Sequence, residues 1–189
     1  MGVLRPSIFA ALLLLSGCAV APKSGPSYVS PPIEKAEASY LLDTGDILRV
    51  TVYNDAQLTN SYGIDDAGYI SLPLVGRVFA RGRTVSQTSA MIEFRLAEGY
   101  LKDPNVAVEV AQYRPFYIQG EVTNSGQFPF VFGMTVRAAI STAGGFTDVA
   151  AKRNVTIHRK TSTGVKKIIV GLDAEIQPGD TIVVAERWL

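Results

Sequence analysis

The chain has 189 residues, with 18 Lys and Arg against 17 Asp and Glu, so its formal net charge is only +1. This balance implies no strongly charged partner, and no dense cluster of Lys and Arg marks a nucleic-acid interface. One His and one Cys cannot supply a metal centre or a Cys–His nucleophile, and no glycine-rich phosphate loop is present. We therefore expect neither an enzyme nor a cofactor.

An apolar run from Ile8 to Leu15 precedes the only cysteine, Cys18. The run is too short to cross a hydrocarbon core, which needs about 20 residues, so residues 1–17 are interpreted as a signal peptide. The small residues directly before Cys18 resemble the bacterial lipobox, in which the cysteine is acylated and becomes the first residue of the mature chain. By the same resemblance Ala19, which is not Asp, favours sorting to the outer membrane. Ordinary secretory cleavage that discards Cys18 is the alternative.

Residues 18–39 are rich in Pro, Ser, Ala and Lys and show no apolar periodicity. This composition predicts a flexible tether. The remaining residues suit one domain or two small ones. A repeat favours two: Gly45-Asp46 and Gly179-Asp180 each precede a run rich in β-branched residues. We place the domains at 40–112 and 113–189, each with one small sheet.

The first domain is predicted to begin with a strand over 47–53, whose alternate residues are apolar. Asn54 and Asp55 end this strand. The residues Asp65, Asp66, Ala67 and Gly68 give a hairpin signal, and the next apolar segment, 72–78, is expected to be one short strand interrupted by Pro73.

A helix is predicted to begin at Thr84, because Gln87 three residues later completes a capping box. Val85, Thr88, Ile92 and Leu96 then follow at helical spacing, and Gly99 ends the helix. The alternating valines of 106–110 predict the last strand of this domain.

The second domain is predicted to begin with a strand over 116–122 that bends at Gly120, followed by a turn that ends at Gly126. Thr135 caps a short helix, which Gly144 and Gly145 terminate. Three more strands are expected over 154–159, 166–170 and 181–184. A helix lying across a mixed sheet gives a β-grasp-like unit, so the predicted fold class of the chain is α+β.

These residues resemble two known domains. The polysaccharide export domain is matched by the positions Tyr40, Leu42, Gly45, Asp46, Leu48, Val50, Val52, Tyr53, Ile64, Asp65, Gly68, Ile70, Leu72, Pro73, Gly76, Pro104, Val106 and Val108. The soluble-ligand-binding β-grasp domain, or SLBB domain, is matched by Arg114, Pro115, Tyr117, Ile118, Gly120, Glu121, Val122, Gly126, Thr135, Val136, Ala143, Gly144, Gly145, Phe146 and Thr147. With the lipobox in front, the chain resembles the outer-membrane polysaccharide export lipoproteins.

The resemblance implies a periplasmic homo-oligomeric ring that conducts capsular or extracellular polysaccharide and is held to the outer membrane by the lipid on Cys18. It also implies an inner-membrane polysaccharide co-polymerase as a partner. Pore-forming members of the family carry a C-terminal amphipathic helix, whereas this sequence stops at Trp188-Leu189. We therefore expect a short member that forms a periplasmic collar.

Candidates for the ligand-contacting lumen of the ring, or for an interface surface, are the following charged residues: Asp65, Asp66, Arg77, Arg81, Arg83 and Arg114. Arginine can pair with acidic sugar substituents, although any one of these residues could equally be solvated loop. The turn residues Gly45, Asp46, Gly120, Gly126, Gly144 and Gly145 are expected to be structural, and His158 to lie in a strand. Two other functions stay open: a periplasmic glycan-binding module that uses the loop 120–126, and a structural linker to the co-polymerase.

Overall fold

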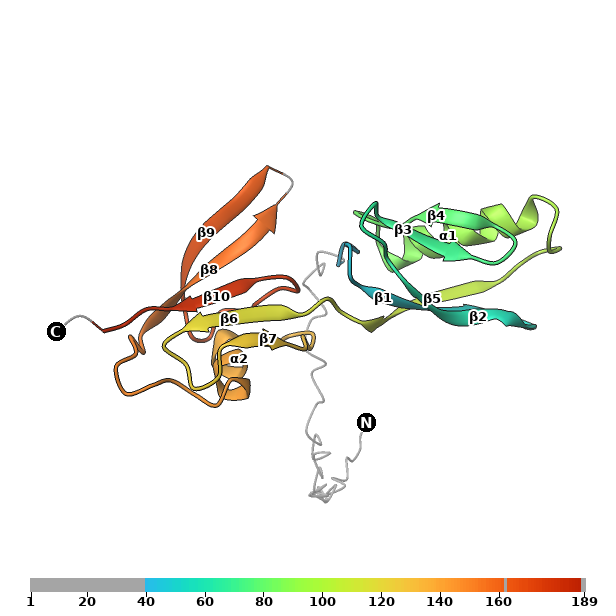
Figure 1. The fold of residues 1–189 in the computed structure, drawn as a ribbon. Coiled ribbons are helices and arrows are strands. Elements are labelled where there is room, and N and C mark those ends of the chain that lie inside the picture. Colours follow the sequence, from blue (N-terminus) through green and yellow to red (C-terminus); the bar gives the residue numbers. More distant parts are fainter. Residues whose placement is uncertain (1–39, 162, 188–189) are drawn as a thin grey trace, which may run out of the picture. The chain divides into compact units, whose positions relative to one another are not determined.

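Two α+β domains follow one another along the chain in the computed structural model, which describes residues 40–161 and 163–187 (Figure 1). Each domain has its own hydrophobic core, one built from residues between Leu42 and Val108 and the other from residues between Phe116 and Val184. The α+β class predicted from the sequence is confirmed. The predicted signal peptide, Cys18, the tether and Trp188 lie outside the described residues.

The first domain contains a three-stranded antiparallel sheet in the order β2-β1-β5. Its strands are β1 (Ile47–Val52), β2 (Asp55–Gly63) and β5 (Val106–Gln112). Leu48, Val50 and Val52 alternate as the buried residues of β1, as predicted. Because Val50 pairs with Val108, the valines of β5 add to the same core.

Strand β1 ends before Asn54, as predicted, but the strand that follows it, β2, was not predicted. Asn54 has a φ of 62°, which turns the chain directly back along β1. The strand is polar and lies at the edge of the sheet, with Leu58 as its one buried residue. A single buried position gives no alternating pattern for sequence reasoning to detect.

The segment predicted as one interrupted strand is instead a hairpin, β3 (Tyr69–Leu72) and β4 (Gly76–Phe79). Pro73 lies in the turn between these strands, because a ring without an N–H group cannot continue a ladder. The Asp65–Gly68 turn does form, with the Gly68 N–H donating to the Asp65 carbonyl at 2.9 Å. It joins β2 to β3, which are not paired with each other. Residues 40–161 and 163–187 therefore contain three sheets rather than the expected two.

Helix α1 (Val85–Ala97) has the predicted capping box. The Gln87 N–H donates to Thr84 Oγ1 at 3.2 Å, and the Thr84 N–H donates to Gln87 Oε1 at 3.0 Å. Thr88, Ile92 and Leu96 form the buried face of the helix, as their spacing predicted. The helix ends just before Gly99, which has a φ of 120°.

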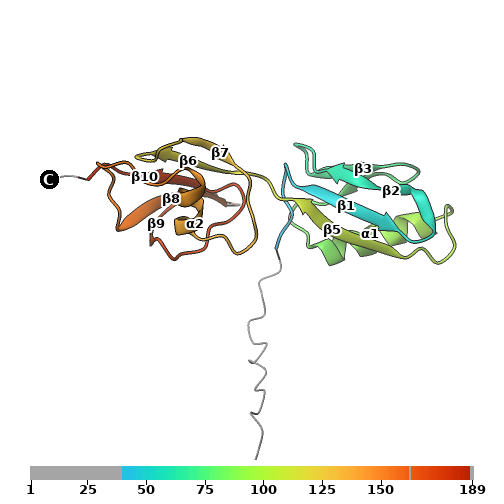
Figure 2. The same ribbon diagram turned by 90° about the horizontal axis from the view of Figure 1, so that it is seen from below.

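The second domain is a five-stranded sheet in the order β7-β6-β10-β8-β9. Its strands are β6 (Phe116–Gly120), β7 (Gly126–Phe128), β8 (Asn154–Thr161), β9 (Gly164–Gly171) and β10 (Thr181–Val184). β6 and β10 are parallel and the other pairs antiparallel, so the sheet is mixed as predicted. Helix α2 (Val136–Thr142), capped by Thr135, lies against one face of this sheet (Figure 2).

Candidate functional site

The β3–β4 hairpin brings several of the candidate side chains together. Buried Ile70, Leu72 and Val78 occupy one face of the hairpin, so its register places Tyr69, Phe79 and Arg77 on the other. The Arg77 guanidinium donates to Asp65 Oδ2 at 2.9 Å and its central carbon lies 4.2 Å from the centre of the Tyr69 ring. Cation and ring are close enough to attract one another.

Asp65 is held as a carboxylate in this arrangement. Its Oδ1 accepts the Tyr69 N–H at 2.8 Å, and this bond, together with the pairing to Arg77, keeps its pKa below the ordinary value. A lowered pKa means that the carboxylate remains charged throughout the neutral range. Asp65 therefore fixes the position of Arg77 and cancels its charge in part.

Arg81 and Arg83 extend the same surface. The guanidinium carbon of Arg83 lies 5.7 Å from the centre of the Phe79 ring, and the exposed Arg81 leaves the hairpin beside Gly68. Asp66 is exposed in the adjoining turn. We call the group formed by Tyr69, Arg77, Phe79, Arg81 and Arg83 the arginine–aromatic surface. Its three cations outnumber the two neighbouring carboxylates, Asp65 and Asp66, so it is positively charged on balance.

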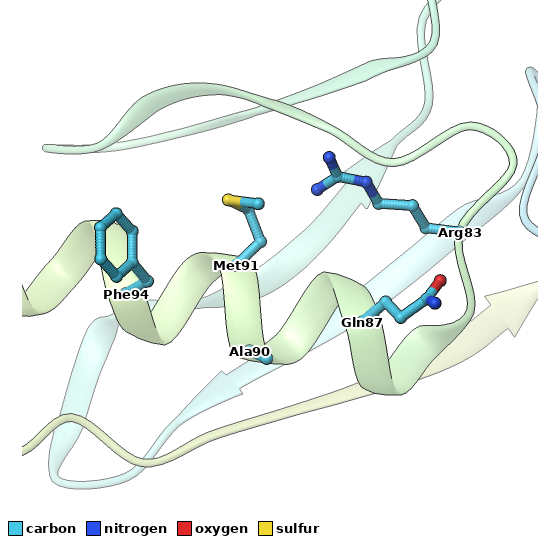
Figure 3. A pocket seen from close by; sticks show the side chains of 5 residues that line it. All are labelled: Arg83, Gln87, Ala90, Met91 and Phe94. Atoms are coloured by element: carbon cyan, nitrogen blue, oxygen red, sulfur yellow. The ribbon is translucent and has the colours of Figure 1, made fainter.

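An open, mostly apolar hollow of about 550 Å³ lies next to Arg83 on the exposed side of α1. Figure 3 shows Met91 and Phe94 on successive turns of the helix, with Gln87 and Ala90 nearer its start. The Phe94 ring is 61% exposed, an unusual state for so large an apolar side chain. Sequence reasoning did not identify Met91, Phe94 or Tyr69 as part of a site. Their spacing from the predicted buried residues could have indicated that these side chains lie outside the core.

Arg114 is separated from the other candidates. Its backbone N–H donates to Asp46 Oδ1 at 2.9 Å and its guanidinium to Asp46 Oδ2 at 3.3 Å. Asp46 is fully buried and also accepts the Tyr40 hydroxyl at 2.7 Å and the Asp43 N–H at 2.9 Å. A buried carboxylate with this many donors holds its partner firmly, because removing either charge leaves the other uncompensated. The side chain of Arg114 is thus engaged within the protein.

Tyr40 contributes to this pair as a neutral donor. Burial, reinforced by its hydrogen bond to Asp46, raises the pKa of the Tyr40 hydroxyl far above its ordinary value. Burial likewise raises the pKa of the neighbouring Tyr113, whose ring meets that of Tyr40 edge to face at 5.0 Å. Both rings therefore remain uncharged beside the carboxylate.

The second Gly-Asp turn holds an equivalent buried pair. Arg159 donates to both carboxylate oxygens of Asp180, at 2.8 and 2.6 Å, and the Gln177 N–H donates at 2.7 Å. The repeat seen in the sequence thus marks two buried carboxylates. Their arginine partners were not predicted, because they lie 68 and 21 residues away along the chain.

The other predicted turn residues have structural positions. Gly120 has a φ of 94°, and a Cβ there would lie 2.1 Å from the Val184 carbonyl oxygen, so no other residue fits. In the loop 120–126, the Thr123 hydroxyl donates to the Gly144 carbonyl at 3.0 Å. Positive φ values are also found at the other predicted turn glycines, Gly45, Gly126, Gly144 and Gly145.

No grouping of His, Cys, Asp and Glu suited to a metal ion occurs within residues 40–161 and 163–187. Over the same ranges, neither helix has the length and apolar character needed to cross a bilayer. His158 lies in β8, as predicted.

Comparison with known families agrees with this architecture. The family described as "Polysaccharide biosynthesis/export protein" matches residues 34–111, and the SLBB domain matches residues 115–170. The chain therefore contains a domain of the polysaccharide biosynthesis/export family, followed by an SLBB domain. This is a family of export proteins and not of enzymes.

Curated relatives carry the same kind of sequence. The exopolysaccharide production protein ExoF of Rhizobium meliloti (strain 1021) is 38% identical over 90 residues, which is 47% of this chain and 21% of ExoF. The polysialic acid transport protein KpsD of Escherichia coli is 28% identical over 163 residues, which is 78% of this chain and 28% of KpsD. The matched part of this chain thus spans less than a third of either relative.

Proposed function

We propose that this chain exports polysaccharide across the cell envelope as a ring of identical subunits. The observation that carries the proposal is that an export domain and an SLBB domain follow one another and together account for most of the described residues. The relatives support it, since one is described as a transport protein for polysialic acid and the other as a protein of exopolysaccharide production. In a closed ring, each subunit presents two different surfaces to its neighbours.

The proposed location is the periplasmic face of the outer membrane, with the lipid on Cys18 as anchor. The support is the lipobox-like sequence before Cys18 and the proline-rich segment that follows it. About 20 residues at up to ~3.3 Å each allow the folded domains to work at a distance from the anchor. An inner-membrane polysaccharide co-polymerase would deliver the polymer to the ring.

The arginine–aromatic surface is the part of the first domain that we assign to contact with the polysaccharide. Its guanidinium groups offer paired donors to hydroxyl and carboxylate oxygens, and the Tyr69 and Phe79 rings are positioned by the same hairpin. The neighbouring carboxylate of Asp65 is already bound to Arg77. Arginines on an open surface hold a polymer loosely, which suits a chain that must move on.

Deletion of the gene tests the proposal. We expect the mutant cells to lose surface or secreted polysaccharide and to regain it when the wild-type gene is supplied. Purified acylated protein should behave as a closed oligomer in crosslinking and by electron microscopy. Unchanged surface polysaccharide in the deletion strain would refute the export role, and a purely monomeric acylated protein would favour a glycan-binding module.

A charge-matched pair of variants tests the assigned surface. Replacing Arg77, Arg81 and Arg83 together by Ala should lower the amount of exported polysaccharide in complemented cells. The control replaces Arg49, Arg95 and Lys102 by Ala, three exposed cations elsewhere in the same domain. Equal export by the two triple variants would remove the arginine–aromatic surface from the proposal.

A further inference from the structure

One face of the five-stranded sheet carries no helix within the described residues. Phe116 and Ile118 of β6 are buried against α2, so the alternation of the strand places Tyr117 and Gln119 on the opposite face. Tyr117 is 43% exposed. We call this side of the sheet the open face; it lies away from α2 in Figure 2.

The register of the sheet aligns side chains of all five strands in one row on the open face. Gln127 pairs with Tyr117, Tyr117 with Thr181, Thr181 with His158, and His158 with Lys167. Neighbouring strands are about 4.8 Å apart, so the four intervals of the row extend over roughly 19 Å. A row of this length can contact several consecutive units of a polymer.

The chemistry of the row is that of a hydrogen-bonding, weakly cationic platform. Amide, phenol, hydroxyl, imidazole and ammonium groups follow one another, and Lys160 adds a second ammonium group on the same face. The next row of the open face consists of Gln119, Val183, Thr156 and Ile169. None of the five strands contains an Asp or a Glu.

We propose that the open face binds a polysaccharide strand that carries carboxylate or phosphate groups. The inference rests on the proposed export function and names the substrate class and a second contact surface for it. Two lysines without a carboxylate in the sheet attract an anionic polymer, the polar row offers partners to sugar hydroxyls, and the amphipathic Tyr117 ring can lie against a sugar ring.

A protein partner fits this face less well. Stable protein interfaces bury about 800 Å² on each side around an apolar centre that is poor in charge. Here Thr181, His158 and Tyr117 occupy the centre of the face with one half-buried apolar residue, Val183, whereas the exposed apolar residues Val165 and Ile169 lie on the edge strand β9. A flat polar centre with charges toward one edge suits a hydrated polymer better.

Adjacent lysines of β9 provide a matched test. Lys167 pairs with His158 on the open face, whereas Lys166 pairs with Arg159 on the side of α2, and both lysines are exposed. The complete chain, purified in detergent and immobilised on a sensor, is titrated with polysialic acid as the acidic probe and dextran as the neutral one. We expect saturable binding of polysialic acid that weakens as salt is added, and weaker binding of dextran.

The single variant Lys167→Ala should weaken the binding of polysialic acid about two- to fivefold, the range for an exposed ion pair, and Lys166→Ala should leave it unchanged. Tyr117→Ala should weaken the binding of both polymers, whereas Tyr53→Ala, which removes a 71% exposed tyrosine of the first domain, should not. Thermal unfolding of each variant identifies any that no longer folds, and Lys167→Gln then replaces Lys167→Ala.

Equal losses for Lys166→Ala and Lys167→Ala would overturn the proposal, as would equal affinity for the acidic and the neutral polymer. Binding of vesicles with anionic lipid through Lys167, without binding of polysialic acid, would assign the face to a membrane surface instead. These outcomes concern the open face alone. The export function itself fails only if deletion leaves surface polysaccharide unchanged.

Discussion

The two Gly-Asp turns have the same local hydrogen bond, but their buried aspartates pair with arginines in different parts of the chain. In each, the Asp side chain is buried and accepts the N–H of the residue three positions before it, from Asp43 at 2.9 Å and from Gln177 at 2.7 Å. Asp180 then binds Arg159 within the second domain, whereas Asp46 binds Arg114, in the segment that joins the domains. Local sequence therefore determines the turn and its buried carboxylate, and the tertiary fold determines which cation neutralises it.

Arg114 also lies against the second turn. A Cβ at Gly179 would be 2.9 Å from Arg114 Nε, and a Cβ at Gly45 would be 3.4 Å from Arg114 Cβ. The side chain of Arg114 is therefore in contact distance of both Gly-Asp turns, while both of its salt bridges, to Asp46 at 3.3 Å and to Asp43 at 3.7 Å, are with the first turn. The comparison predicts that Asp46 is more sensitive to substitution than Asp180, and that Gly179 is more sensitive than Gly45.

The largest effect is expected for Asp46→Ala. It removes the acceptor of the Tyr40 hydroxyl and leaves Arg114 with the more distant Asp43 at 3.7 Å, and losing one member of a buried pair costs about 3–5 kcal/mol. Asp180→Ala should cost less, because Asp180 accepts hydrogen bonds from Arg159 and the Gln177 N–H, whereas Asp46 also accepts one from a tyrosine hydroxyl. Urea unfolding of both variants measures the difference. A smaller loss for Asp46→Ala than for Asp180→Ala would contradict the comparison.

Tyr40→Phe should lower the free energy of unfolding by about 1.5–3 kcal/mol, the range for a hydrogen bond to a charged group. The raised pKa of Tyr40 adds a pH dependence. Because the folded protein favours the neutral phenol, the contribution of Tyr40 is fully present below the ordinary pKa of 10.0 and is lost as pH rises above it.

The stability of Tyr40→Phe should therefore fall less steeply than that of the wild type between about pH 8 and about pH 11. Unfolding curves of both proteins across this range give the two slopes. Parallel slopes would mean that Tyr40 does not carry the alkaline sensitivity.

Ala substitutions at the turn glycines should have intermediate effects. Both Gly45→Ala and Gly179→Ala force a left-handed backbone, which costs roughly 1–2 kcal/mol. Gly179→Ala should be the costlier, because its Cβ also displaces the Arg114 guanidinium. Gly171→Ala, at a position without positive φ and with open space around it, is the control. The midpoint of urea unfolding measures these effects. An identical midpoint for Gly45→Ala and Gly179→Ala would argue against displacement of the Arg114 guanidinium.

Arg77→Ala should have the smallest effect on stability. Its ion pair with Asp65 is exposed, and such pairs contribute about 0–1 kcal/mol. A thermal midpoint close to that of the wild type is expected, in contrast to Asp46→Ala. A large loss would show that Arg77 holds the hairpin together, and its use as a polysaccharide contact would then be hard to test by substitution.

Strongly periodic elements were predictable from the sequence. Helix α1 was predicted from the capping box of Thr84 and Gln87 and from the spacing of Ile92 and Leu96. The prediction worked because neighbouring side chains satisfy the free backbone N–H groups at the start of a helix. Polar β2 escaped prediction, since an edge strand is stabilised by its ladder with β1 and not by burial of its own side chains.

The candidate site was predictable only in part. Arg77, Arg81, Arg83 and Asp65 are close in sequence, and one hairpin was enough to bring them together. In the sequence, nothing distinguished Arg114 from the other candidate arginines. Its partner Asp46 lies 68 residues away, and no local pattern reports such a pairing.

The two buried ion pairs also constrain how the sequence can change over evolution. Position 46 pairs with 114 and position 180 with 159, so an acid lost from either pair removes the nearest carboxylate of its arginine. Substitutions should therefore occur together within each pair in related chains, and the two pairs should vary independently of one another. Arg114 has the further restriction that its neighbours at 45 and 179 must stay small.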